Sequence, residues 1–186
     1  PKGQPPLTDH SSPVVMRGED VKVWFPIKKG FLRRTVDHVK AVDGIDVTIR
    51  AGQTLGIVGE SGSGKTTLGL ALARMISSTG SIKFAGRDIN ALTFKQMRPL
   101  RREMQIVFQD PFGSLSPRMP ITDIIAEGLL VHEPKLSPSE RDSRVVAALN
   151  EVGLDPSLRF RYPHEFSGGQ RQRIAIARAM VLNPRF

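Results

Sequence analysis

The chain has 186 residues, a formal net charge of +9 and no cysteine, so disulfides and thiolate metal sites are excluded. Its hydrophobic share of 39% is ordinary for a globular domain and argues against general disorder. No apolar run approaches the roughly 18 residues of a membrane-spanning helix, and the polar, proline-rich start is unlike a signal peptide.

The N-terminal part of the chain predicts a linker followed by β-strands. Residues 1–20 begin with a proline-rich, polar stretch and are interpreted as a linker. A strand is predicted at Val21 to Phe25, where we expect Trp24 and Phe25 to pack in a core. Apolar residues alternate from Ala41 to Ile49 and predict a second strand.

Strands and helices alternate over the next fifty residues. Thr54 to Val58 is short, apolar and bounded by glycine, which is typical of a strand buried on both faces. Apolar residues at helical spacing follow from Thr66 to Met75, and further strands are predicted at Ser81 to Phe84 and Gln105 to Gln109. This alternation predicts an α/β fold with a mainly parallel sheet.

The character of the chain changes to helix over residues 111–165. One helix is predicted at Ile121 to Val131. A second begins at Ser137-Pro138-Ser139-Glu140, which has the residues of a capping box, and ends at Gly153. We therefore expect one domain over residues 21–186, in which 111–165 form a helical insert.

A glycine-rich loop predicts a site for nucleotide phosphates. The sequence after the strand at 54–58 matches the pattern GxxxxGK[ST] in full and leads into a helix. Glycines let backbone amides approach an anion, and the helix dipole favours negative charge there. Lys65 would meet the β and γ phosphates, and Thr66 would offer a hydroxyl to Mg²⁺. The alternative is a glycine-rich turn that happens to precede a helix. The predicted ATP-binding residues are Gly59, Glu60, Ser61, Gly62, Ser63, Gly64, Lys65, Thr66 and Thr67.

A second glycine motif begins another predicted helix. The run Phe166-Ser167-Gly168-Gly169-Gln170-Arg171-Gln172-Arg173 precedes the helical stretch Ile174 to Leu182. Read alone, it is as compatible with an ordinary N-capped helix as with an anion site. Read after the glycine-rich loop, it resembles the signature of the ABC ATPase family, LSGGQ, with Phe166 in place of the leucine.

This resemblance implies a P-loop NTPase fold with an N-terminal antiparallel β part, a parallel core and a helical insert. It implies that two ATPase domains pair head to tail, so that Ser167, Gly168, Gly169 and Gln170 contact the nucleotide bound by the partner domain. Gln109, in Val107-Phe108-Gln109-Asp110-Pro111, resembles the family's Q-loop glutamine, which contacts Mg²⁺ or the attacking water. With Thr66 it is a predicted Mg²⁺ ligand. Taken in isolation, Gln109 would be a polar strand end.

Four segments narrow the resemblance to ATPases of oligopeptide, dipeptide and nickel importers, and in particular to the second ATPase unit of fused peptide-importer subunits. They are Val39 to Gly44, the run GESGSGKTT, Phe108 to Arg118 and Arg161 to Arg173. The resemblance implies an ATP-hydrolysing subunit, peripheral at the cytoplasmic face of the bacterial inner membrane. Its partners would be permease membrane subunits, a second ATPase domain and, indirectly, a periplasmic peptide-binding protein.

The scattered basic residues lack interleaved aromatic residues, so we expect no nucleic-acid partner. The alternative function is a soluble ABC ATPase that acts on DNA or ribosomes. In the family, Asn183-Pro184-Arg185-Phe186 would lead into the Walker B strand with its aspartate and catalytic glutamate, and a switch histidine would follow. We therefore expect this chain to end before these groups and to be inactive alone. His38 is the candidate adenine-stacking residue, and Pro111 to Pro120 is a candidate surface for docking on membrane subunits.

Overall fold

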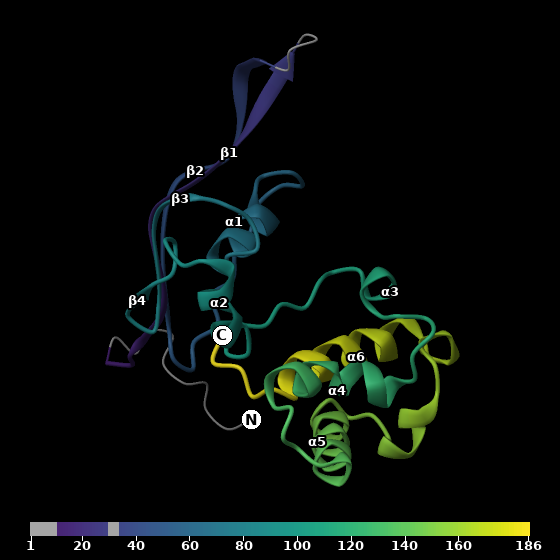
Figure 1. Cartoon of the computed structure of the whole chain (residues 1–186). Coiled ribbons are helices and arrows are strands. Elements are labelled where there is room, and N and C mark those ends of the chain that lie inside the picture. Colours follow the sequence, from purple (N-terminus) through teal and green to yellow (C-terminus); the bar gives the residue numbers. More distant parts are fainter. Residues whose placement is uncertain (1–10, 30–33) are drawn as a thin grey trace. The chain divides into compact units, whose positions relative to one another are not determined.

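The computed structural model describes residues 11–29 and 34–186. The chain divides into two compact units, Pro1–Met97 and Arg98–Phe186, and each is described here by itself (Figure 1). Helix α2 (Phe94–Arg101) spans the boundary between them. In the described residues, no helix has both the length and the apolar character needed to cross a membrane.

The first unit is built on a four-stranded antiparallel sheet with the strand order β2-β1-β3-β4. Its strands are β1 (Val14–Lys29), β2 (Arg34–Arg50), β3 (Thr79–Phe84) and β4 (Arg87–Asp88). The predicted strands at 21–25, 41–49 and 81–84 and the N-terminal antiparallel β part are thereby confirmed. Strand alternation buries one set of side chains against helix α1, which explains the apolar spacing of the sequence. The buried set includes Met16, Val21, Val47, Ile82 and Phe84.

The predicted linker boundary is wrong at its C-terminal end. Strand β1 begins at Val14, and Met16 pairs with both Ile49 of β2 and Phe84 of β3. Residues 14–20 therefore belong to the sheet, because this part of β1 pairs with a neighbouring strand on each side. Residues 1–10 of the predicted linker lie outside the described residues.

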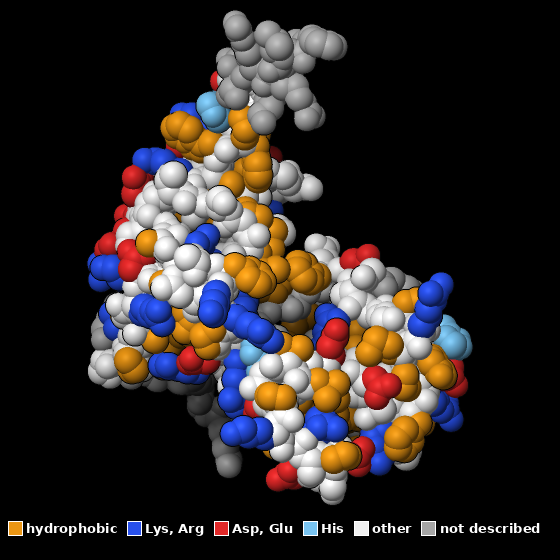
Figure 2. All heavy atoms as spheres, viewed as in Figure 1, with side chains coloured by type: hydrophobic (Ala, Val, Ile, Leu, Met, Phe, Trp, Pro, Cys, Tyr) orange, Lys and Arg blue, Asp and Glu red, His pale blue; other side chains and the backbone are white. Residues whose placement is uncertain are grey.

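Strands β1 and β2 continue past β3 as a two-stranded ribbon. Pairing between β1 and β3 runs from Met16 to Lys22, whereas pairing with β2 continues to Lys29. On this ribbon Trp24 and Phe25 are 43% and 47% exposed, and hydrophobic side chains show at its surface (Figure 2). The predicted core packing of these two aromatic residues is therefore wrong, because no third strand or helix among the described residues covers them.

The mainly parallel sheet is not formed by the described residues. Residues 54–58 and 105–109 are not strands, and Val58 is 93% exposed although it was expected to be buried on both faces. A strand needs a hydrogen-bonded neighbour, and no strand among the described residues pairs with either segment. The apolar content of 54–58 is right for a buried strand, but its partner is not among these residues.

Helix α1 (Lys65–Leu72) follows the glycine-rich loop in the first unit. Leu68, Ala71 and Leu72 are buried, as the helical spacing predicted. The helix ends at Leu72, earlier than the predicted Met75. Arg74, two residues later, takes a positive φ of 55°. The Arg74 guanidinium donates to the carbonyls of Ile89 and Leu92, which fixes the chain after the helix.

The second unit is helical. It contains α3 (Pro111–Ser114), α4 (Ile121–His132), α5 (Pro138–Glu151) and α6 (Gly168–Met180), with two 3₁₀ turns at Pro156–Phe160 and Pro163–Glu165. The predicted capping box at the start of α5 is present: the Glu140 amide donates to Ser137 Oγ, and the Ser137 amide donates to Glu140 Oε2. The Ser137 hydroxyl also donates to Glu140 Oε2 at 2.7 Å, and this bond, together with the one from the Ser137 amide, holds the pKa of the Glu140 carboxyl below its usual value.

The helical unit is larger than the predicted insert of residues 111–165. It extends from Arg98 to Phe186 because α6 supplies a large part of its core. Buried residues of α6, among them Ile174 and Ala177, pack in one cluster with Ile125 and Leu129 of α4 and Leu149 of α5. A helix with such an apolar stripe needs partner helices, and α4 and α5 supply them.

Candidate functional site

The glycine-rich loop of residues 59–64 is braced directly against strand β2. Gly64 precedes α1 with φ of +88°, and a Cβ placed on it would lie 2.1 Å from the Ala41 carbonyl oxygen. Gly62 also takes a positive φ, of 81°. Side chains at these positions would either clash or strain the turn, so the glycines are there to bring the loop backbone onto the sheet.

Lys65, the first residue of α1, folds its side chain back over this loop. Its Nζ donates to the carbonyl oxygens of Gly59, at 2.8 Å, and Glu60, at 2.5 Å, and it lies 3.2 Å from Ser63 Oγ. The ammonium group is thus held among the backbone turns of the loop, at the positive end of a helix. A cation held at a helix N-terminus is one component of an anion site.

Thr66 lies one residue into the helix and is exposed, so its hydroxyl is available to a cation at the loop. The described residues contain no cluster of three His, Cys, Asp or Glu side chains that could hold a metal ion. Magnesium does not require such a cage when phosphate oxygens and water complete its octahedron. The donor set therefore fits Mg²⁺ through Thr66 only together with a phosphate ligand.

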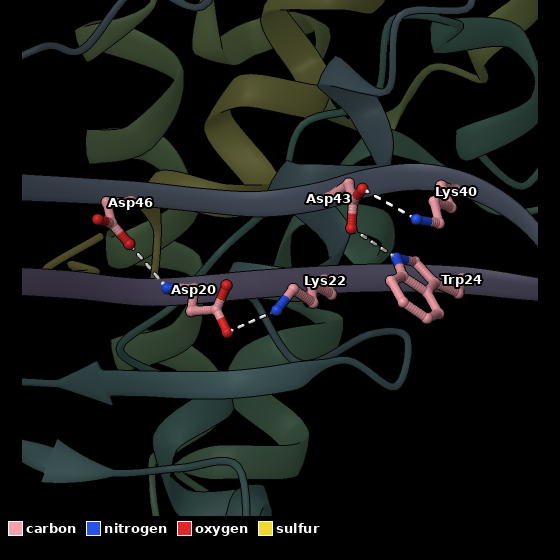
Figure 3. A network of polar contacts seen from close by, with 6 residues as sticks. All are labelled: Asp20, Lys22, Trp24, Lys40, Asp43 and Asp46. Atoms are coloured by element: carbon pink, nitrogen blue, oxygen red, sulfur yellow. Dashed lines mark hydrogen bonds and ion pairs between the residues drawn. The ribbon is translucent and has the colours of Figure 1, made fainter.

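Trp24 and His38 form an aromatic pair on the ribbon next to the loop. Their ring centroids are 6.1 Å apart at an interplanar angle of 53°. The Trp24 indole donates to Asp43 Oδ1 at 3.0 Å, and the ammonium of Lys40 lies 4.5 Å from the indole centroid (Figure 3). These contacts fix the tryptophan at an exposed position, with the Lys40 ammonium over its ring.

The ribbon connects this pair to the glycine-rich loop. Trp24 pairs with Lys40, which is the residue before Ala41, and Ala41 is the strand residue against which Gly64 rests. His38 lies three residues along β2 from Ala41, which is about 10 Å of strand. The structure thus places the predicted residue His38 on the strand that contacts the loop, beside Trp24, for which the sequence predicts a place in the core.

Two further acidic residues lie on the ribbon near the first residues of β3, where the pairing of β1 with β3 stops. The Asp20 amide donates to Asp46 Oδ1 at 2.7 Å, and Asp20 takes a positive φ of 49°. Lys22 Nζ lies 2.7 Å from Asp20 Oδ2, and this hydrogen bond raises the pKa of Lys22 (Figure 3). Since the strand register shifts on both sides of Val21, these polar contacts stabilise a bulge that turns the ribbon.

In the second unit, the signature residues form the start of α6. Ser167 is the N-cap: its Oγ accepts from the Gln170 amide at 3.3 Å, and the Gln170 side chain accepts from the Ser167 amide at 2.9 Å. A Cβ added to Gly168 or Gly169 would meet no atom within 4 Å. The local geometry is that of an N-capped helix, with open space where side chains of its first two residues would lie.

Phe166, which replaces the signature leucine, is only 6% exposed and packs in the helical core. Gln109 is exposed and lies in a bend just before α3. Gln109 and the signature residues belong to the second unit, and the glycine-rich loop, Trp24 and His38 belong to the first. The predicted site residues therefore form two groups. One group belongs to the first unit and the other to the second.

Known proteins are similar to this chain in sequence and fold. The chain is 70% identical over 186 residues to the peptidoglycan transport ATP-binding protein YejF of Agrobacterium fabrum. The match covers all of this chain and 34% of that protein. It is 45% identical over 175 residues to the oligopeptide transport ATP-binding protein OppF of Salmonella typhimurium, over 92% of this chain and 52% of that protein. The predicted resemblance to peptide-importer ATPases is thereby confirmed. The chain spans about a third of the first relative and half of the second.

A solved structure agrees with these relatives. The dimeric structure of MJ0796, a bacterial ABC transporter cassette, matches with a TM-score of 0.79 and 26% sequence identity, over 91% of this chain and 70% of that chain. The same cassette is known in a post-hydrolysis state bound to ADP and Pi. The ABC transporter family profile matches residues 42–186, and the chain therefore belongs to the ABC transporter family.

Proposed function

We propose that this chain is the ATP-binding part of a subunit that hydrolyses ATP to energise a peptide-type ABC importer. The names of its relatives support the transport class. The observation that carries the proposal is the glycine-rich loop, which Gly64 braces against Ala41 and in which the Lys65 ammonium is held. A glycine loop that contacts a strand and holds one cation at a helix N-terminus matches the needs of a triphosphate.

In this proposal the residues of the first unit bind one nucleotide along the ribbon. The amides of Gly62 to Thr67 and the Lys65 ammonium hold the β and γ phosphates. Thr66 would hold Mg²⁺, which would neutralise charge that develops on the phosphate oxygens. The adenine would stack on the aromatic pair of Trp24 and His38, since a base offers a π-face to such a surface.

The second unit would act on the nucleotide of another ATPase domain. Ser167 and the amides of Gly168 and Gly169 would contact its γ-phosphate in a head-to-tail dimer, as a helix N-terminus favours an anion. Gln109 would orient the attacking water or bind Mg²⁺. Permease membrane subunits would receive the resulting motion through residues 111–120, and a periplasmic peptide-binding protein would deliver the cargo. The subunit would lie on the cytoplasmic face of the inner membrane.

Hydrolysis in this scheme also needs a carboxylate that activates water. We infer that the 186-residue chain alone does not turn over ATP, because the residues expected to supply the Walker B aspartate and the catalytic glutamate are not among those of this sequence. ATP hydrolysis by the isolated chain at the rate of the whole protein would contradict this inference.

The test uses Lys65→Ala in the whole protein that carries this sequence, with Lys83→Ala as its matched control. Lys83 is an exposed lysine of β3 in the same unit, away from the loop. We expect Lys65→Ala to abolish ATP hydrolysis and peptide uptake and Lys83→Ala to change neither. Unchanged nucleotide affinity and unchanged peptide uptake in Lys65→Ala would contradict the proposal. Hydrolysis stimulated by DNA or ribosomes, without uptake, would favour a soluble ABC ATPase.

A further inference from the structure

Helix α6 reaches from the signature residues to the segment that follows Gln109. The guanidinium of Arg178, a partly buried residue near the end of α6, donates through Nη1 to the Ser114 carbonyl oxygen. Ser114 is the last residue of the short helix α3, which begins two residues after Gln109. Arg178 lies about 16 Å along the helix axis from Ser167. One rigid helix thus carries the signature at its start and a hold on the Gln109 segment near its end.

The bond has a clear physical reason. A helix of four residues cannot satisfy its own C-terminal carbonyls, and a cation is the preferred donor at that end. A hydrogen bond from a charged group is also stronger than one between neutral groups. Leu115, the next residue, is 4% exposed and packs in the helical core. The segment is therefore held at two adjacent points, one apolar and one charged.

Other arginines of the helical unit donate to backbone carbonyls elsewhere, which provides an internal comparison. Arg144 of α5 donates to the Val181 carbonyl at 2.6 Å, and Arg173 of α6 donates to the Gly153 carbonyl at 3.1 Å. These bonds tie helices and turns to one another. The bond from Arg178 differs because its acceptor lies in the segment that leads directly from a candidate catalytic residue.

We propose that Arg178 is a positioning residue that fixes the Gln109 segment to the signature helix, so that both move as one body. Its effect on catalysis rests on the proposed function, whereas its hold on residues 109–114 does not. Losing the bond should loosen the segment between Val107, which packs against the helical core before Gln109, and the buried Leu115, which follows Ser114. Gln109 would then be misplaced for most of the time, while nucleotide binding at the glycine-rich loop would be unaffected.

The first test measures amide hydrogen exchange in the peptide 105–116 of the whole protein. Arg178→Met keeps the apolar stem and removes the donor, and Arg144→Met is the matched control. We expect exchange in this peptide to be about tenfold faster in Arg178→Met, unchanged in Arg144→Met and near wild type in Arg178→Lys, which retains a donor. An unchanged rate in Arg178→Met, or an equal rise in Arg144→Met, would overturn the proposal.

The second test separates positioning from general damage. Arg178→Met should lower kcat for ATP hydrolysis about tenfold with KM for ATP within about twofold, and Arg144→Met should change neither. A rise in KM with kcat unchanged would contradict the positioning role. If Arg178→Met fails to fold, Arg178→Gln, with its shorter uncharged side chain, is measured with the same two outcomes. A wild-type protein that does not hydrolyse ATP would refute the proposed function, while the exchange rates would still decide the role of Arg178.

Discussion

The Ala41 carbonyl oxygen occupies the space that any side chain on Gly64 would need, since a Cβ there would approach it to 2.1 Å. Gly64 also has φ of +88°, a conformation that other residues rarely adopt. The glycine-rich loop thus contacts strand β2 at a point where only glycine fits. This contact links the position of the loop to the same strand that carries His38 and Lys40.

Gly64→Ala should therefore push the loop away from β2. We expect the affinity for ATP to fall at least about tenfold and the free energy of unfolding to fall by about 1–3 kcal/mol. Gly69→Ala is the control, because Gly69 lies within α1 and a Cβ there would meet nothing within 4 Å. That variant should be more stable than wild type by about 0.5–1 kcal/mol. Titration calorimetry and urea unfolding check both; wild-type affinity in Gly64→Ala would contradict the prediction.

Two substitutions of Ser167 should separate its capping role from phosphate contact. Ser167→Ala removes the acceptor for the Gln170 amide and should cost about 1 kcal/mol of stability. Ser167→Asp keeps an acceptor at the N-cap, so its stability should be close to wild type, but its charge would repel a γ-phosphate. We expect ATP hydrolysis by the whole protein to be lost in Ser167→Asp. Full hydrolysis in this variant would show that Ser167 does no more than begin the helix.

Trp24 should contribute more to adenine binding than the sequence interpretation allowed. Stacking on an aromatic ring contributes about 1–3 kcal/mol per base, so Trp24→Ala should weaken ATP binding about tenfold. His38→Ala should also weaken it, whereas Phe25→Ala should not, because neighbouring strand residues point to opposite faces. ATP should quench the fluorescence of Trp24, the one tryptophan in this sequence. Quenching that persists unchanged in Trp24→Phe would come from elsewhere and would argue against this platform.

His132 should make the helical unit less stable in mild acid. Burial, together with the charges of Arg98 and Arg102, lowers the pKa of His132 from its usual value of 6.5, against a smaller opposing effect of Glu133. The unfolded chain then binds more protons, so the free energy of unfolding falls as the pH drops below about 6.5 towards the lowered pKa. His132→Asn should lose less stability between pH 8 and pH 5.5 than wild type does.

Urea unfolding at the two pH values measures this difference. Arg98→Met removes one of the charges that act on His132, so the pKa of His132, followed by NMR, should rise towards its usual value. Identical pH dependence in wild type and His132→Asn would show that other groups dominate the acid response of this unit.

The local features were predictable from the sequence because they depend on near neighbours in the chain. The glycine-rich loop leading into α1, the capping box of Ser137 and Glu140, and the strand alternation over 41–49 are each set by a few adjacent residues. The buried residues Leu68 and Leu149 follow from helical spacing alone. The helical stretch Ile174 to Leu182 likewise predicts that the signature residues lie at the start of a helix, which the structure confirms.

What depends on distant partners was not predictable in this way. Val58 and Trp24 are both apolar residues in strand-like runs, yet their burial depends on whether another element covers them, and none of the described residues does so. The sequence by itself determined the motifs, the helices and the family, because these are encoded in short runs. Only the tertiary structure decided that Trp24 lies beside His38, that Gly64 rests on Ala41 and that Arg178 holds Ser114. Each is a contact between residues far apart in the chain, and such a contact exists only once the backbone has folded.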